Sequence, residues 1–367
     1  MKATLGYLCS SESWGGLEMN HLRNAFWMQS KGYDVVIICL KNTAIENTAR
    51  ELELPVLTIP KHKKYYDFKK GKNLVNQISQ HNISHLLIRS TYDMSIMAYV
   101  KRRLGTNLHT SYFMEMQLGV KKTNLLHTLR FKYIDLWSCP LNWLKVQVET
   151  LTNFNNELVV IPSGLELSQF QNMPSKENSR NVLNLPPEKL IFGLIGRFDV
   201  QKGQLLLLKA MQECRNKEFV VVLLGEPTLH EGDTYYNDVK ATIQSGQLEQ
   251  RVFIRPFQKD TSVFYNSIDW LVMATKAETF GMVTIEALAC GTPVLGSNAG
   301  GTPEILENEK GGLLFEPLNE KDLATKIDQI CEDTVPRDRE ELLKMAHKYN
   351  HQGVCKMVEH ALGLPTN

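Results

Sequence analysis

The sequence of 367 residues has no long apolar run, no C-x-x-C pair and no Asp-x-Asp motif. No segment approaches the roughly 18 uninterrupted apolar residues that a membrane span requires, and Ser and Glu interrupt the apolar stretch at 3–9 before it could form the core of a signal peptide. The seven cysteines are scattered and odd in number, which argues against a disulfide framework and against a zinc site. We therefore expect a protein of the reducing cytoplasm.

Low-complexity tracts and internal repeats are also lacking, and no compositional sign of disorder is present. The hydrophobic fraction is 43% and the charged fraction 22%, as in soluble globular proteins. A chain of this length exceeds the roughly 250 residues at which a single core tends to divide, so we expect two domains.

Charge of neither sign dominates, since the net charge is +1, but the two halves differ. Residues 1–163 contain 20 Lys and Arg against 12 Asp and Glu, and the remainder contains 21 against 28. The basic excess lies at 61–72, 101–103 and 121–122. It is either a solvated surface or a surface for anionic lipid headgroups or phosphorylated acceptors. No nucleic-acid-binding motif accompanies the charge, so we expect no nucleic-acid partner.

Short apolar runs alternate with longer amphipathic segments, the pattern of parallel sheets with crossover helices. The expected strands of the first half are 4–9, 34–40, 56–59, 85–89, 108–114, 135–139 and 158–161. Those of the second half are 190–195, 219–224, 252–254, 270–274, 293–296 and 312–315, and two final helices are expected at 337–347 and 352–362. The predicted fold class is α/β with two Rossmann-like domains.

The alternating pattern lapses between residues 161 and 190. Pro162, Ser163 and Gly164 are turn residues, and the polar stretch at 169–180 has no periodic apolar positions. We place the connection between the domains there. The predicted domains are residues 1–165 and 166–345, followed by a C-terminal helical segment at 346–367.

The most informative segment is E-T-F-G-M-V-T-I-E at 278–286. A loop containing Gly281 precedes a helix that begins near Met282, and the unpaired N–H groups of a helix start form an anion site. Glu278 lies in the loop, and Glu286 lies about one turn into the helix. Taken alone, either glutamate is explained as well by a favourable interaction with the helix dipole as by ligand binding. The pair suits recognition of sugar hydroxyls, one on a ribose and one on a hexose.

A second segment, G-L-I-G-R-F-D-V-Q-K-G at 193–203, ends a buried strand with Arg197 and Lys202 in the following loop. A guanidinium and a mobile ammonium together suit a diphosphate. Alone, the segment is equally a strand-to-helix turn with surface cations. Its position favours binding, because ligands of open α/β sheets bind beyond the carboxyl ends of the strands, where both segments lie.

These motifs resemble the retaining GT4-type glycosyltransferases of GT-B fold. The resemblance rests on G-R-x-x-x-x-K-G, on E-x-F-G-x-x-x-x-E about 75 residues later and on G-G-x-x-E at 300–304, and it extends to W-G-G-L-E at 14–18, G-Y-D-V at 32–35 and V-I-P-S-G-L-E at 160–166. It implies two facing Rossmann-like domains and a C-terminal helix that returns to the first. A nucleotide-diphosphate sugar would bind mainly to the second domain and the acceptor mainly to the first.

The same resemblance assigns roles to individual residues. Arg197 and Lys202 match the diphosphate-binding pair, Glu286 the ribose ligand and Glu278 the glutamate near the donor sugar. Backbone amides of the helix start would bind the β-phosphate, and two glycines of the first domain would approach the phosphates. These further donor-binding candidates are Phe280, Gly281, Met282, Val283, Thr284, Gly15 and Gly16.

The catalytic-site histidine that the family has in its first domain is not clearly matched. His109 is the nearest candidate by order, and Glu115 is a second. Two mild departures accompany this: Ala274 and Thr275 stand where the family often has Pro-Ser, and residues 163–166 read S-G-L-E where it commonly has N-G-V-D.

The lack of an Asp-x-Asp motif gives no support to a metal-clamped diphosphate, so we expect no metal ion or other cofactor and expect Arg197 and Lys202 to neutralise the leaving phosphate. A UDP-sugar is the first donor to consider. The expected acceptor is a glycan or a lipid-linked molecule, reached at the inner face of the membrane through the basic first half. A nucleotide-sugar epimerase and an inactive sugar-nucleotide-binding protein stay open as alternatives. A dinucleotide oxidoreductase is disfavoured, because it would need a G-x-G-x-x-G motif after a strand and the sequence has none.

Overall fold

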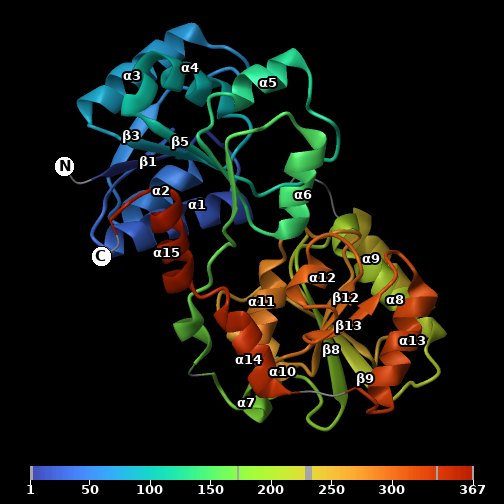
Figure 1. Ribbon diagram of the computed structural model, residues 1–367. Helices are drawn as coiled ribbons and strands as arrows, with labels where there is room; N and C mark the ends of the chain where they lie inside the picture. The colour runs from blue at the N-terminus through green and yellow to red at the C-terminus, as the bar shows by residue number, and fades with distance from the viewer. Residues whose placement is uncertain (1–2, 172, 228–233, 336–337, 366–367) are drawn as a thin grey trace. The chain divides into compact units, whose positions relative to one another are not determined.

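The computed structural model describes residues 3–171, 173–227, 234–335 and 338–365. The chain divides into two compact units, Met1–Gly164 with His351–Asn367, and Leu165–Asn350. Figure 1 shows the elements of both. The boundary predicted after residue 165 lies one residue from the first division, and the C-terminal segment predicted from residue 346 begins five residues before the second.

The described residues form two sheets in which all strand pairs are parallel. The first sheet has the order β3-β2-β1-β4-β5-β6-β7 and consists of β1 (Thr4–Cys9), β2 (Asp34–Leu40), β3 (Val56–Ile59), β4 (His85–Ile88), β5 (His109–Phe113), β6 (Leu136–Cys139) and β7 (Glu157–Val160). The second has the order β10-β9-β8-β11-β12-β13 and consists of β8 (Leu190–Ile195), β9 (Phe219–Leu224), β10 (Val252–Arg255), β11 (Trp270–Met273), β12 (Val294–Ser297) and β13 (Gly312–Phe315).

Helices connect successive strands in both units. The first unit contains α1 (Gly16–Ser30), α2 (Ala44–Glu51), α3 (Phe68–Gln80), α4 (Met94–Leu104), η1 (Gly105–Asn107), α5 (Leu125–Phe131), α6 (Asn142–Leu151) and α15 (His351–Ala361). The second contains η2 (Leu167–Phe170), α7 (Lys176–Val182), η3 (Val200–Lys202), α8 (Gln204–Glu213), α9 (Thr234–Ser245), α10 (Ser262–Ser267), α11 (Met282–Ala289), α12 (Thr302–Ile305), α13 (Glu320–Cys331) and α14 (Arg339–His347).

The predicted fold class is confirmed, and each predicted strand is found to within one residue at either end. The apolar runs that predicted the strands are buried almost throughout, as expected for a parallel sheet covered on both faces. The connection at 161–190 is less irregular than predicted, because it contains η2 and α7. The Ser175 hydroxyl caps α7 by accepting from the Asn178 N–H, and Arg180 is buried against Asp269, so polar contacts rather than apolar periodicity stabilise this helix.

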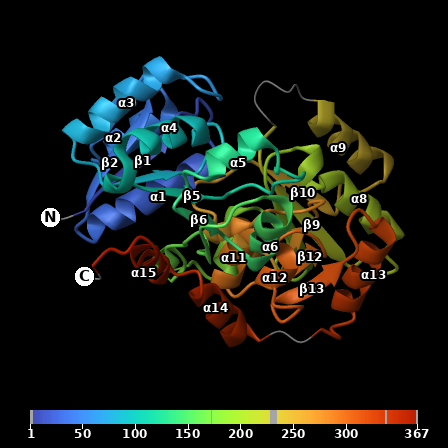
Figure 2. The same cartoon turned by 45° about the horizontal axis from the view of Figure 1, so that its top comes forward.

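Two sets of helices cover the two faces of the first sheet. Leu5 and Tyr7 of β1 pack with α1, α2 and α15, whereas Leu8 packs with α3, α4 and α6, because successive strand side chains point to opposite faces. Figure 2 shows α3 and α4 side by side, in agreement with their contacts. The last helix, α15, therefore belongs to the first core, as expected from the sequence.

The second sheet is covered in the same way. Helices α8, α9 and α13 pack on one face around Phe192 and Val221. On the other face α10 approaches so closely that a Cβ at Gly193 would lie 2.7 Å from the ring of Phe264. Both Rossmann-like units thus have the three layers that leave the strand ends accessible.

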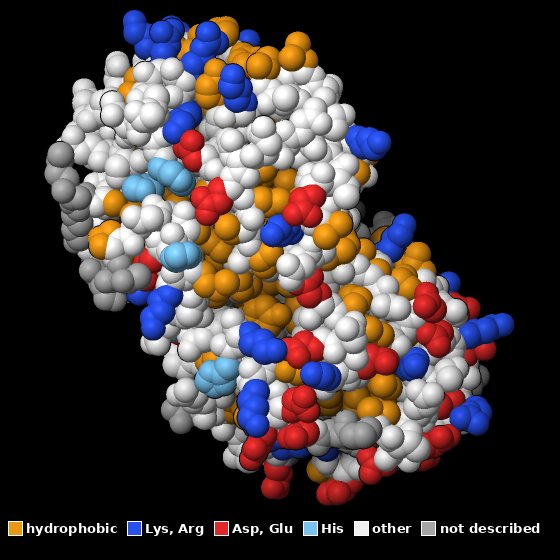
Figure 3. All heavy atoms as spheres, in the orientation of Figure 1, with side chains coloured by type: hydrophobic (Ala, Val, Ile, Leu, Met, Phe, Trp, Pro, Cys, Tyr) orange, Lys and Arg blue, Asp and Glu red, His pale blue; other side chains and the backbone are white. Residues whose placement is uncertain are grey.

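Lys and Arg side chains gather over α3 and α4 of the first unit, whereas Asp and Glu side chains are frequent on the second (Figure 3). The charge difference between the halves of the sequence is therefore a difference between the surfaces of two units. Among the described residues, no helix has the length and apolar character to cross a membrane.

The packing of the C-terminal segment gives the first prediction. Leu362 is 3% exposed within the first core, so Leu362→Ala should lower the free energy of unfolding of the first unit by about 2–5 kcal/mol. Met357 on the same segment is 41% exposed, and Met357→Ala should change it by less than about 0.5 kcal/mol. Urea-induced unfolding followed by circular dichroism measures both, and equal effects would contradict the assignment of this segment to the core.

Candidate functional site

Each sheet has one point at which the strand order reverses. In the first sheet it lies between β1 and β4, and in the second between β8 and β11. Ligands of doubly wound sheets bind beyond the carboxyl ends of the strands at this point. The loop with Arg197 and Lys202 follows β8, and the loop with Glu278 follows β11, so the structure places the two predicted segments on either side of the switch point of the second sheet.

Close backbone packing brings Lys202 to this point. Gly203 has φ +76° and follows η3, and a Cβ there would lie 2.2 Å from the carbonyl oxygen of Ala274 at the end of β11. The Lys202 Nζ is 3.4 Å from Glu278 Oε2, and both side chains are partly exposed. Arg197 is exposed, and its guanidinium forms no hydrogen bond or ion pair with the described residues. The structure therefore brings one cation, Lys202, beside the Glu278 carboxylate, and Arg197 lies exposed in the same loop as Lys202.

The loop carrying Glu278 is fixed by its backbone. The Gly301 N–H donates to the Glu278 carbonyl at 2.8 Å, and a Cβ at Gly300 would lie 2.2 Å from that oxygen. The G-G-x-x-E motif that follows β12 thus supports the loop that follows β11. This contact requires glycine at position 300.

Helix α11 begins beside Glu278. Gly281 is the N-cap in the left-handed region, at φ +81°, and the Thr284 N–H already donates to its carbonyl at 3.0 Å. The amides of Gly281, Met282 and Val283 are therefore the predicted groups left to bind an anion. The Thr284 hydroxyl is buried without a hydrogen-bond partner among the described residues.

Phe280, predicted to bind the donor, is buried rather than exposed at the site. It is 5% exposed, and its ring packs edge-to-face on Tyr349 with centroids 5.8 Å apart. Its contribution in the structure is to anchor the loop in the core of the second unit.

Glu286 is held by a residue that the sequence analysis missed. Tyr265 of α10 is fully buried and donates its phenol O–H to Glu286 Oε2 at 2.7 Å. Burial and the nearby Glu286 carboxylate raise the pKa of Tyr265 well above its usual range, so the phenol stays a donor. Tyr265 belongs to no recognisable motif, and only the packing of α10 on α11 reveals it.

In the first unit, Gly15 caps α1 in an extended conformation, and Gly16 is its first residue. A Cβ at Gly16 would meet nothing within 4 Å, and one at Gly15 would meet only Glu18 Oε2 at 3.6 Å. Packing within the unit therefore does not require these glycines, and the space beside them is open.

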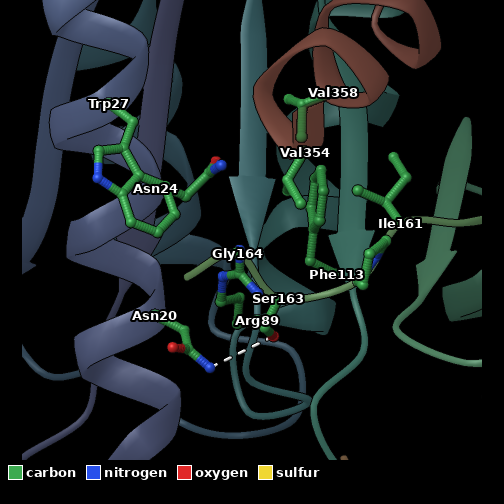
Figure 4. Close-up of a pocket in the computed structure, with 11 residues that line it drawn as sticks. Asn20, Asn24, Trp27, Arg89, Phe113, Ile161, Ser163, Gly164, Val354 and Val358 are labelled. Carbon is green, nitrogen blue, oxygen red and sulfur yellow. Dashed lines mark hydrogen bonds between the residues drawn. The ribbon is translucent and has the colours of Figure 1, made fainter. Parts of the chain in front are cut away.

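A buried polar cluster lies at the same edge of the first sheet. Glu115, directly beyond β5, forms an ion pair with Arg89, directly beyond β4, and each side chain is 9% exposed. Burial raises the pKa of Glu115, although Arg89 acts in the opposite direction. Asn20 of α1 lies 3.4 Å from Glu115 Oε2 and donates to the Ser163 hydroxyl at the same distance (Figure 4). The neighbouring cavity, of about 10 Å³, is large enough only for water.

His109 does not join these residues. It is the first residue of β5, paired with His85 at the start of β4, and the two rings lie 5.3 Å apart. A strand of five residues separates its ends by about 13 Å. His109 therefore lies at the amino edge of the sheet, opposite Glu115, and its predicted place at the acceptor edge is wrong. The expected strand at 108–114 has His109 as its second residue, which already indicates the amino end.

Three loops at the carboxyl edge of the first sheet meet in a buried cluster. His62, beyond β3, places Nε2 3.0 Å from Asp93 Oδ1 and 3.1 Å from the Ser10 hydroxyl, and its Nδ1 2.9 Å from the Lys63 carbonyl. Burial alone would lower the pKa of His62, but its hydrogen bonds to Asp93 and to the Lys63 carbonyl raise the pKa above the ordinary value. The imidazolium therefore joins the loops that follow β1, β3 and β4.

The family profile that the sequence matches covers mainly the second unit. Residues 175–352 match the family profile described as glycosyl transferases group 1. A D-inositol 3-phosphate glycosyltransferase of Corynebacterium kroppenstedtii is 28% identical over 183 residues, which are 48% of this chain and 40% of that protein. The sulfoquinovosyl transferase SQD2 of Arabidopsis thaliana is 30% identical over 188 residues, which are 50% of this chain and 35% of that protein. The chain thus matches less than half the length of either relative.

Solved structures are similar over the whole chain. A glycosyltransferase from Rickettsia africae has a TM-score of 0.85 at 19% identity, covering 98% of both chains. Anabaena Alr3699/HepE, solved in complex with UDP, has a TM-score of 0.85 at 20% identity, covering 99% of this chain and 100% of that one. At these identities the likeness shows a shared fold.

The His62 cluster gives a prediction that is independent of any ligand. Because the pKa of His62 is raised on folding, its stabilisation is complete below about pH 6.5 and is lost as the pH rises through the raised value. The difference in unfolding free energy between the wild type and His62→Gln should therefore be largest near pH 6 and shrink towards pH 9. Urea unfolding at several pH values measures it, with exposed His81→Gln as the control; a difference independent of pH would refute the charged pair.

Proposed function

Because residues 175–352 belong to the glycosyl transferases group 1 and the two Rossmann-like units have the GT-B fold of their structural neighbours, we propose that this GT4-type chain is an active glycosyltransferase. It moves a hexose from a nucleotide-diphosphate sugar to a hydroxyl of a glycan or lipid-linked acceptor, with retention of anomeric configuration. The observation that carries the proposal is the meeting of Lys202, Glu278 and the start of α11 at one switch point.

The donor would be held by groups of opposite character. Arg197 and Lys202 bind the diphosphate, and the Met282 and Val283 amides supplement them at the positive end of α11. Lys202 contacts Glu278 at 3.4 Å, so an incoming diphosphate would compete for the ammonium and release the Glu278 carboxylate towards the sugar hydroxyls. Glu286, oriented by Tyr265, would accept from the ribose hydroxyls.

In the transfer step, the bond between the anomeric carbon and the phosphate oxygen breaks, and a bond from that carbon to the acceptor oxygen forms on the same face. The transition state has oxocarbenium character, and the leaving phosphate takes the proton of the acceptor hydroxyl. Arg197 and Lys202 stabilise the charge that develops on the phosphate, without a metal ion.

A UDP-sugar is the first donor to test, since the structure of Anabaena Alr3699/HepE is described with UDP and with UDP-glucose. On the acceptor side, the open space beside Gly15 and Gly16 suits close approach of a phosphate group to the backbone. Glu115, with Arg89, replaces His109 as the first-unit candidate near the reaction.

Neither alternative function gains an observation of its own. The comparisons give no support to a nucleotide-sugar epimerase. A sugar-nucleotide-binding protein without activity would hold its ligand with the same cations and the same Glu278 loop, so measured turnover is what distinguishes it from the enzyme. Peripheral contact with a membrane stays a prediction.

The direct test of the proposal is a thermal-shift screen with UDP, GDP, ADP and their common sugars. At least one nucleotide should raise the unfolding temperature, because a ligand that binds the folded state stabilises it. Arg197→Ala and Lys202→Ala should each reduce turnover about 10²–10³-fold with an unchanged circular dichroism spectrum. Lys209→Ala, an exposed change on α8, is the control. Near-normal turnover in both site variants, or no stabilising nucleotide, would overturn the proposal.

The bond between Tyr265 and Glu286 gives a separate prediction. Tyr265→Phe removes the O–H donor and keeps the ring, so the KM for the donor should rise about tenfold, the effect expected for a hydrogen bond to a charged group. The kcat should change little, because the ribose is remote from the reacting carbon. Steady-state kinetics separate the two, with Tyr236→Phe on α9 as the matched control; an unchanged KM would exclude the positioning role.

A further inference from the structure

Arg130 of α5 is a buried cation without a counter-charge. The structure buries three arginines among its described residues: Arg89, Arg130 and Arg180, at 8%, 2% and 6% exposure. Arg89 pairs with Glu115 and Arg180 with Asp269. Arg130, the most buried of the three, forms no ion pair with any carboxylate in the described residues.

The contacts that Arg130 does form are neutral. Its Nη2 donates to the Thr91 carbonyl at 2.6 Å, and its Nε is buried without a partner among the described residues. The ring of Tyr65 lies over the guanidinium, with the centroid 5.1 Å from Cζ. Because an unpaired buried charge is costly, this arrangement calls for an anion that the described residues of the first unit do not supply.

Two lysines, Lys64 and Lys122, act on the same neighbouring side chain as Arg130. Burial, together with the charges of Arg130, Lys122 and Lys64, lowers the pKa of the nearby His127. Lys64 also lies over the Tyr65 ring, 5.8 Å from its centroid. Burial lowers the pKa of Arg130, and the phenols of Tyr65, Tyr66 and Tyr112 act in the opposite direction, Tyr65 also through a side-chain hydrogen bond.

The position of the cluster relates it to the acceptor. Lys64 and Tyr65 follow β3, Thr91 follows β4, and α5 follows β5, so all of them lie at the carboxyl edge of the first sheet. Gly15, beyond β1, lies at the same edge. Helix α5 also packs on α4, which holds it to this part of the unit.

We propose that Arg130, flanked by Lys64 and Lys122, is a subsite for a phosphate group carried by the acceptor. The guanidinium supplies directed N–H donors and the lysines supply mobile charge, the combination that recognises a phosphate. The Tyr65 ring, which is 42% exposed, covers the guanidinium and moves aside when the phosphate binds. That the phosphate belongs to the acceptor rests on the proposed function; that Arg130 binds a phosphate does not.

Direct binding to the full chain tests the subsite without donor or turnover. Isothermal titration with sn-glycerol 3-phosphate in about 150 mM KCl should give saturable binding, with sulfate as a competitor. Arg130→Gln should weaken it about ten- to hundredfold, the loss expected for one charged hydrogen-bonding group. Arg102→Gln, an equal change of charge at an exposed position of α4, should bind like the wild type.

Two further measurements separate the subsite from a structural role and from the donor site. Arg130→Gln removes an uncompensated buried charge but also loses the bond from Nη2 to the Thr91 carbonyl, so its unfolding temperature should stay close to that of the wild type. UDP should still raise the unfolding temperature of this variant. If UDP raised it neither in the wild type nor in any variant, the result would count against the proposed function and not against the subsite.

The source of the phosphate is distinguished by a second probe. Phosphatidylcholine vesicles with and without phosphatidic acid should be co-sedimented with the protein. Binding to phosphatidic acid that depends on Arg130, without binding to sn-glycerol 3-phosphate, would support the subsite and identify a lipid headgroup. Binding of neither probe, or equal losses in Arg130→Gln and Arg102→Gln, would overturn it.

Discussion

All strands of each sheet run parallel, and this constraint places the whole of the candidate site. Every loop that follows a strand opens at the carboxyl edge, so residues far apart in sequence meet there. Lys202 and Glu278 lie in the loops after β8 and β11, on either side of the point where the strand order reverses, and their side chains contact each other. The first sheet repeats the arrangement with the loops after β1 and β4.

The fold was largely predictable because burial on both faces of a parallel sheet demands continuous apolar strands. Those runs are short and bounded by turn residues, so even their ends were found. Helix α7 was missed for the complementary reason. Its stability comes from the Ser175 cap and from the burial of Arg180 against Asp269, and neither leaves an apolar period in the sequence.

The site was predictable to the extent that it consists of motifs. Arg197, Lys202, Glu278 and Glu286 were indicated by their charge, by their position after strands and by the resemblance to the GT4-type motifs. The residues that orient them were not visible, since Tyr265 reaches Glu286 only through the packing of α10 on α11. His109 was misplaced because it was chosen by its order along the chain, although its place as the second residue of the expected strand at 108–114 indicates the amino end.

Charge composition separates the two units in a way that single motifs do not. The second unit neutralises Arg180, the one arginine that it buries among the described residues, with a carboxylate, and its cations at the switch point are exposed or partly exposed. The first unit does the same for Arg89 and then departs from the rule at Arg130, which acts on His127 together with Lys64 and Lys122. Solvation explains the exposed cations spread over α3 and α4. Solvation does not explain the Arg130 guanidinium, because at 2% exposure water cannot stabilise it. An anion recruited from outside the chain accounts both for the burial of Arg130 and for its place at the acceptor edge.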